Sequence, residues 1–128
     1  MKKTVTTFAF LFLTYNFLSA QPGILKMIEN KKFEKAEKEL VKDLEKNPES
    51  IVSNYTMAML LINRDNTGYN PEKAWEFLMK ASTRFRNETD EKVLKNLAKI
   101  PVGQTEIAAL TDTIASCALE DAIQKSIK

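Results

Sequence analysis

The spacing of the apolar residues constrains this chain more than any other feature of its sequence. From residue 33 onward they recur every three or four positions, as expected for helices that bury one side, with Lys and Glu filling most positions between them. Residues 33–46 show the clearest stripe, formed by Phe33, Ala36, Leu40, Val41 and Leu44. No stretch shows the sustained alternation of a strand. The sequence therefore predicts an all-α fold.

Helix-starting and helix-ending residues divide this pattern into a series of helices. The predicted breaks lie near residue 30 and at residues 47–50, 64–70, 87–90 and 101–103. Pro48 disfavours the helical conformation of Asn47, whereas Ser50 and Asn70 are good N-caps. The helix predicted for residues 51–63 is apolar on several sides, so we expect it to be buried between neighbours.

The missing residue types exclude several classes of chemistry. With no histidine and one cysteine, the chain lacks histidine-dependent triads, histidine-containing zinc sites and intrachain disulfides. Its three glycines form no phosphate-binding loop. The acidic cluster at residues 88–91 lacks the regular ligand spacing of a calcium loop. Glu120 and Asp121 are adjacent, so we expect them on different helix faces. The sequence predicts no catalytic residue, no metal site and no cofactor.

Residues 1–20 form a predicted export signal. Lys2 and Lys3 precede an apolar run at residues 8–18 that is too short to span a membrane, and Ala20 supplies the small residue of a cleavage point. Glutamine directly after a Ser-Ala end is similar to exported proteins of Bacteroidetes. The interpretation places the protein in the periplasm or cell envelope.

Cleavage would leave residues 21–128 as one helical domain. Since Lys2 and Lys3 leave with the signal, the remaining acidic and basic side chains are equal in number and interspersed. Nucleic-acid binding needs clustered positive charge. We therefore expect no nucleic-acid partner, and no integral membrane span after cleavage.

An internal echo links two of the predicted helices. Residues 34–36 read Glu-Lys-Ala and residues 72–74 read the same, and a leucine follows each alanine one turn later, Leu40 and Leu78. With these residues, the part of the chain at 24–86 resembles the tetratricopeptide repeat, a pair of antiparallel helices with small residues where the helices cross. The matching positions are Phe33, Ala36, Leu40, Pro48, Ala58, Ala74, Leu78 and Ala81. The resemblance implies antiparallel helix-turn-helix pairs stacked into an α-solenoid of about three pairs.

The chain departs from the repeat pattern at two positions. Asn54 stands where the first helix of a unit usually has tryptophan, and Arg86 lies near the expected closing proline. A plain bundle of three or four helices would show similar apolar periodicity. Both arrangements are therefore open on the sequence alone.

The resemblance implies that the first helix of each pair supplies the partner-binding surface. In the second unit the corresponding residues are Val52, Tyr55, Thr56, Met59 and Asn63. Some family members grip a peptide carboxylate with Lys and Asn, which this chain lacks at the matching positions. Tyr55 and Met59 either form an adaptable apolar surface for a partner helix or peptide, or pack in the core.

The last predicted helix, which opens at Thr105, carries two apolar stripes. One is formed by Ile107, Leu110, Ile114, Ala118 and Ala122, and the other by Leu119, Ile123 and Ile127. A capping helix should have a polar outer face. The second stripe therefore predicts self-association, binding of a partner, or a natural chain that continues past Lys128.

These observations predict an exported, non-catalytic, tetratricopeptide-like module that binds a protein or peptide, or scaffolds an assembly, in the bacterial envelope. One alternative is a small helical bundle with a ligand-binding or catalytic pocket between helices. That alternative would bring several of Tyr55, Arg64, Tyr69 and Glu76 around a deep cleft. The other alternative is the N-terminal adaptor segment of a longer envelope protein.

Overall fold

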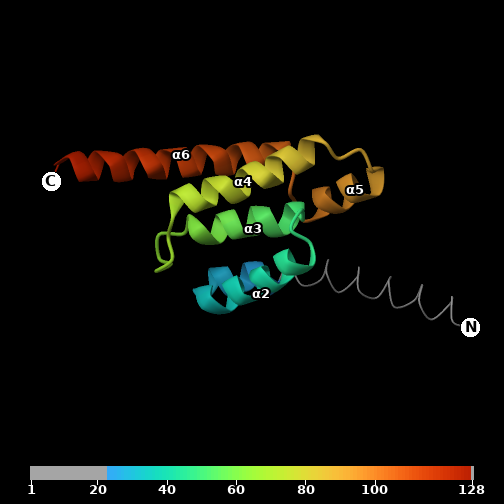
Figure 1. Cartoon of the computed structure of the whole chain (residues 1–128), viewed down its shortest axis with the longest axis horizontal. Coiled ribbons are helices and arrows are strands. Elements are labelled where there is room, and N and C mark those ends of the chain that lie inside the picture. The colour runs from blue at the N-terminus through green and yellow to red at the C-terminus, as the bar shows by residue number, and fades with distance from the viewer. Residues whose placement is uncertain (1–22, 128) are drawn as a thin grey trace, which may run out of the picture.

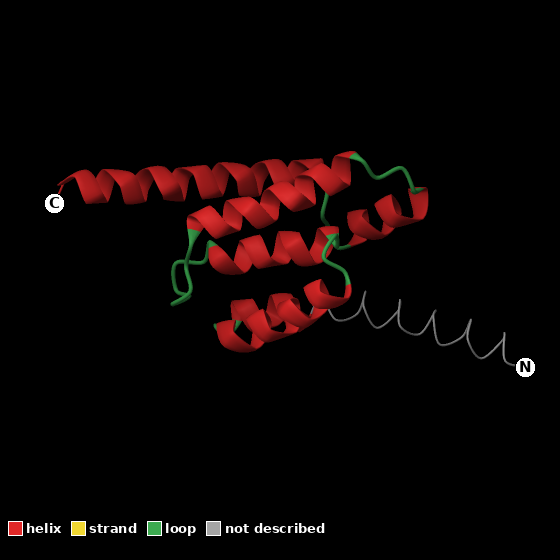
Figure 2. Cartoon of the chain, viewed as in Figure 1, coloured by secondary structure: helices red, strands yellow, loops and turns green. Residues whose placement is uncertain are grey.

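The computed structural model describes residues 23–127, and every regular element in that part of the chain is a helix (Figure 2). A helical segment at residues 23–29 is followed by α2 (Phe33–Lys46), α3 (Ile51–Leu61), α4 (Pro71–Arg86), α5 (Glu91–Lys99) and α6 (Gln104–Ile127). The all-α prediction is confirmed, and the breaks lie where the sequence predicts them. The predicted export signal lies outside the described residues.

The longer helices stack side by side, with successive members of the stack antiparallel (Figure 1). Helix α3 packs between α2 and α4, and α4 packs between α3 and α6. The short helix α5 lies at the end of the stack where α4 finishes. The repeat resemblance implies a regular third helix pair in which α5 would pack along α6. In the structure, α6 packs extensively against α4 instead. The antiparallel α3–α4 hairpin fits the resemblance, and the regular solenoid stays a prediction.

Helix α3 is the centre of the core. It begins at Ser50, whose Oγ accepts a hydrogen bond from the backbone N–H of Ser53 at 3.2 Å, as expected for an N-cap. Nearly every residue of α3 is buried, including Ala58 and Leu60, which have no exposed surface. The prediction of a helix buried between neighbours is confirmed.

Small residues lie where the stacked helices meet. Ala36, Ala58, Ala74 and Ala81 are completely buried, as are Leu40, Leu60 and Leu78. Alanine allows two helix backbones to approach closely, and leucine fills the neighbouring groove. The alanine and leucine positions quoted for the repeat resemblance are thus core positions.

The two halves of α6 have different surroundings. Ile107, Leu110 and Ile114 are buried against the stack, which confirms the first part of the predicted stripe. Ala118 and Ala122, the other members of that stripe, are exposed. The end of α6 extends beyond the neighbouring helices and has little against which to pack (Figure 1).

Candidate functional site

Two of the five residues of the predicted binding surface on α3, Val52 and Thr56, are buried. Val52 is buried and packs in an apolar cluster that also contains Leu97 and Val102. Thr56 is also buried, and its Oγ1 donates a hydrogen bond to the backbone carbonyl of Val52 at 2.7 Å. Val52 therefore packs at the junction of α3 with the α5 region, whereas the Thr56 hydroxyl has its hydrogen-bond partner within α3.

The other three residues of that predicted surface are half-buried. Tyr55 packs against both apolar clusters, and burial, followed by the nearby negative charge of Glu106, raises the pKa of its hydroxyl. Met59 packs against the main cluster, and Asn63 Oδ1 accepts a hydrogen bond from the N–H of Asp65 at 3.0 Å. The alternative in which Tyr55 and Met59 pack in the core fits their surroundings, and their contact with a partner stays a prediction.

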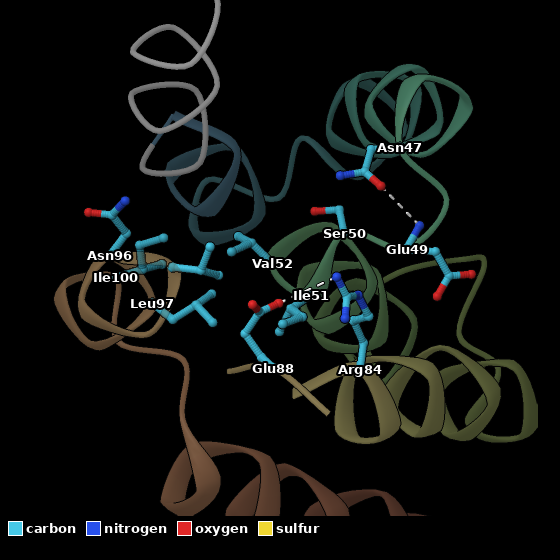
Figure 3. Close-up of a pocket in the computed structure, with 11 residues that line it drawn as sticks. Asn47, Glu49, Ser50, Ile51, Val52, Arg84, Glu88, Asn96, Leu97 and Ile100 are labelled. Carbon is cyan, nitrogen blue, oxygen red and sulfur yellow. Dashed lines mark hydrogen bonds and ion pairs between the residues drawn. The ribbon is translucent and has the colours of Figure 1, made fainter. Parts of the chain in front are cut away.

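A pocket of about 270 Å³ lies where α3 begins, α4 ends and α5 passes (Figure 3). Its apolar lining includes Ile51, Val52, Leu97 and Ile100. At its rim Arg84 forms an ion pair with Glu88 at 3.4 Å, drawn as a dashed line in Figure 3. The pocket is slightly smaller than the roughly 300–1,000 Å³ of usual ligand sites. Of the charged residues that line it, Arg84 and Glu88 are paired with each other.

The four residues that would mark a catalytic cleft do not gather around one. Arg64 and Tyr69 are neighbours, with the guanidinium carbon 5.2 Å from the centre of the ring. Tyr55 belongs to the apolar core, and Glu76 lines a shallow groove between α4 and α6. Within residues 23–127, no group of three or more Cys, Asp and Glu side chains is arranged to hold a metal ion. No helix of that part is long and apolar enough to cross a membrane.

Arg64 and Tyr69 instead attach the end of α6 to the α3–α4 loop. Arg64 donates hydrogen bonds to Asp121 Oδ1 at 3.1 Å and to Glu120 Oε2 at 2.8 Å, and Tyr69 donates its hydroxyl to Asp121 Oδ2 at 2.8 Å. Glu120 and Asp121 point in different directions from α6, as expected for adjacent helical residues, and yet both contact Arg64. The two residues are about 100° apart on the helix, but the forked guanidinium contacts both.

The pKa values in this polar cluster follow from its hydrogen bonds. The hydrogen bond from Tyr69, and then the one from Arg64, lower the pKa of Asp121. Burial and the same bond to Asp121 raise the pKa of Tyr69, and the bond to Asp121 raises the pKa of Arg64. Each group is held in its usual charge state, which favours a structural attachment over proton transfer.

The α3–α4 loop has an ordered conformation that positions these side chains. Asn66 is buried, its Nδ2 donates to the carbonyl of Leu60 at 3.0 Å, and its Oδ1 accepts from the N–H of Gly68 at 3.0 Å. The backbone N–H of Asn70 donates to the carbonyl of Leu61 at 2.8 Å. The loop thus closes on the end of α3 and presents Arg64 and Tyr69 toward α6.

The side of α6 away from Asp121 is apolar and exposed. We define this outer face as Ala115, Ala118, Leu119, Ala122, Ile123 and Ile127. Leu119 is 63% exposed, Ile123 47% and Ile127 72%. The face adjoins a shallow groove at the start of α4, where Trp75 is 41% exposed. Contiguous apolar surface of this kind is typical of interaction sites, so the outer face is the strongest candidate for a functional surface.

Comparison of the chain with protein-family models, with curated proteins and with solved structures finds no match. The residue arrangement therefore carries the functional argument. The stripe of Leu119, Ile123 and Ile127 is predictable from the sequence, whereas the attachment of Arg64 to Glu120 and Asp121 has no local sequence signal. An arginine in one loop and an acidic pair far along the chain become a site only when the helices stack.

Proposed function

We propose that this chain is an exported, non-catalytic module that binds a protein through the outer face of α6 and so scaffolds an assembly in the bacterial envelope. The observation that carries the proposal is the orientation of the end of α6. Its polar side is attached to the α3–α4 loop, and its apolar side is turned outward. A helix on a protein surface normally turns its apolar side to the core and its polar side to solvent.

The contacts of residues 117–127 support binding over a purely structural role for this segment. Cys117 and Asp121 are its half-buried members, and the other residues are exposed. Ordering a segment costs conformational entropy, which little apolar burial offsets here. Because Leu119 and Ile123 are not needed to fill the described core, their apolar side chains favour an intermolecular role.

The arrangement of the ionisable groups favours binding over catalysis. In the α6 cluster, the groups with shifted pKa values are Arg64, Tyr69 and Asp121, and they hydrogen-bond one another. At the α3–α5 pocket, Arg84 and Glu88 form an ion pair. General acid–base catalysis needs a group free to exchange a proton with a substrate. The tetratricopeptide resemblance points in the same direction, since that family acts through protein binding.

Photocrosslinking in cells tests the binding part of this proposal. A photoreactive amino acid replaces Ile123 in the outer face, and in a matched variant it replaces Gln124, which lies on the polar side of the same turn. We expect ultraviolet-dependent protein adducts from position 123 and several-fold fewer from position 124. Equal or absent adducts at the two positions would contradict a binding role for the outer face.

Cell fractionation tests the export part separately. The chain carries a C-terminal tag and is expressed in a Gram-negative bacterium, and its N-terminus is sequenced. We expect periplasmic or envelope-bound protein that begins at or within a residue or two of Gln21. Uncleaved protein in the cytoplasm would refute export.

A further inference from the structure

We infer that the occupant of the outer face is a second copy of this chain, bound through an antiparallel pair of α6 helices. This inference rests on the proposed function and names its partner. The reason is self-complementarity: an isologous dimer requires one surface that fits itself. The outer face has this property in its apolar residues and in the charges beside them.

The apolar residues match when the two helices cross near Asp121. Residues equally far before and after the crossing point then lie opposite each other, so Leu119 of one copy meets Ile123 of the other, twice in each dimer. Ile127 of the second copy reaches the level of Ala115. Ala115 also lines the groove between α4 and α6 that contains Trp75.

The charges beside the outer face match in the same register. Glu72 and Glu76 line that groove, and the ion pairs found in residues 23–127 do not involve them. Lys125 lies two turns after Ala118, which lines the groove, so Lys125 is on the side of α6 that faces α4. In an antiparallel pair, like flanks of the two helices face each other. Lys125 of the second copy therefore approaches Glu72 and Glu76.

The exposed area suits a reversible dimer. Leu119, Ile123, Ile127 and Trp75 together expose on the order of 400 Å² of apolar surface per copy, the size of patch found at interaction sites. Two copies together contribute about 800 Å² of this surface, below the roughly 1,200 Å² at which standard specific interfaces begin, as expected for a weak and reversible dimer. The end of α6 projects past the other helices, so a second copy has space beside it (Figure 1).

Sedimentation equilibrium on the protein recovered from the exporting cell tests the apolar contact. We expect a concentration-dependent monomer–dimer equilibrium with a micromolar Kd, and an Ile123→Asp variant with a Kd at least about 30-fold higher. Gln124→Asp adds the same charge one residue later on the polar side, and should leave Kd within about twofold. Circular dichroism of both variants checks that the fold is intact.

Charge reversal tests the register of the two helices. Lys125→Glu should raise Kd about threefold to tenfold, and so should the double variant Glu72→Lys, Glu76→Lys. Combining all three changes should restore most of the lost affinity, because the opposite charges then meet again. If the combined variant is no tighter than the separate ones, the proposed register is wrong.

Two results would overturn the inference. One is a protein that stays monomeric up to hundreds of micromolar, and the other is a dimer that Ile123→Asp does not weaken. If position 123 nevertheless crosslinks to a different protein in cells, the second copy is excluded and the binding function survives. If it crosslinks to nothing, both proposals fail.

Discussion

Helix α3 and the end of α6 both carry several large apolar side chains, yet those of α3 are mostly buried and those of the end of α6 are exposed. Helix α3 has α2 on one side and α4 on the other, so its side chains are buried. Among residues 23–127, the helix that packs extensively against α6 is α4, and the buried residues of α6 lie in its first half. The comparison teaches that apolar side chains on a helix predict a covering neighbour, but not whether residues 23–127 supply it.

The largest expected effect is a difference in stability when the same substitution, leucine to alanine, is made in each of these two regions. Leu60→Ala, in α3, removes a completely buried side chain and should lower the free energy of unfolding by about 2–5 kcal/mol. Leu119→Ala, in the open part of α6, should change it by less than about 0.5 kcal/mol. Urea denaturation followed by circular dichroism measures both, at a protein concentration low enough to keep the chain monomeric. Equal losses would contradict the difference between the two regions.

A buried polar group in α3 provides the next test. Asn54 Nδ2 donates to the carbonyls of Pro48 at 3.0 Å and Ser50 at 2.7 Å, and so holds the turn between α2 and α3. Asn54→Ala leaves these carbonyls without that partner and should cost about 1–3 kcal/mol of stability. Asn63→Ala, at a half-buried position at the other end of the helix, is the control and should cost less than half as much. The stability losses of the two variants are compared from their urea midpoints of unfolding, with the slope of unfolding free energy against urea concentration held constant.

A smaller and more local effect should follow from releasing the end of α6. Tyr69→Phe removes the hydroxyl that donates to Asp121, while the ring keeps its packing. We expect amide hydrogen exchange in residues 117–127 to become several-fold faster, and exchange in α3 to stay unchanged. Tyr55→Phe is the matched control, and it should leave residues 117–127 as they are. Faster exchange throughout the chain would instead indicate global destabilisation.

The pH dependence of the same attachment should be the smallest effect. Hydrogen bonding lowers the pKa of Asp121 below its ordinary value of 3.8. A lowered pKa in the folded state stabilises the attachment above pH 3.8, and this contribution is lost as the pH falls through the lower folded-state value. Exchange protection of residues 117–127, corrected for intrinsic rates, should therefore be constant from pH 7 to pH 5 and decrease only below about pH 3.8. In Asp121→Asn this decrease should be absent.

The helices themselves could be predicted because local rules determine them. Ser50 and Asn70 cap α3 and α4 as their side chains suggest, each accepting a backbone N–H three residues later. The spacing of Leu119, Ile123 and Ile127 likewise predicts the second apolar stripe of α6. The packing of α6 on α4, and the attachment of Arg64 to Asp121, join distant parts of the chain. Periodicity shows that a face is apolar, but not which helix covers it, so these contacts needed the structure.

Amide hydrogen exchange at two protein concentrations tests the central claim most directly, because it observes both regions in one sample. The claim is that the fold of α3 is complete within one copy, whereas the outer face of α6 is covered only by a second copy. We predict that residues 117–127 are several-fold more protected well above the dimer Kd than well below it, and that α3 is equally protected at both. Concentration-independent protection of residues 117–127 would contradict the account.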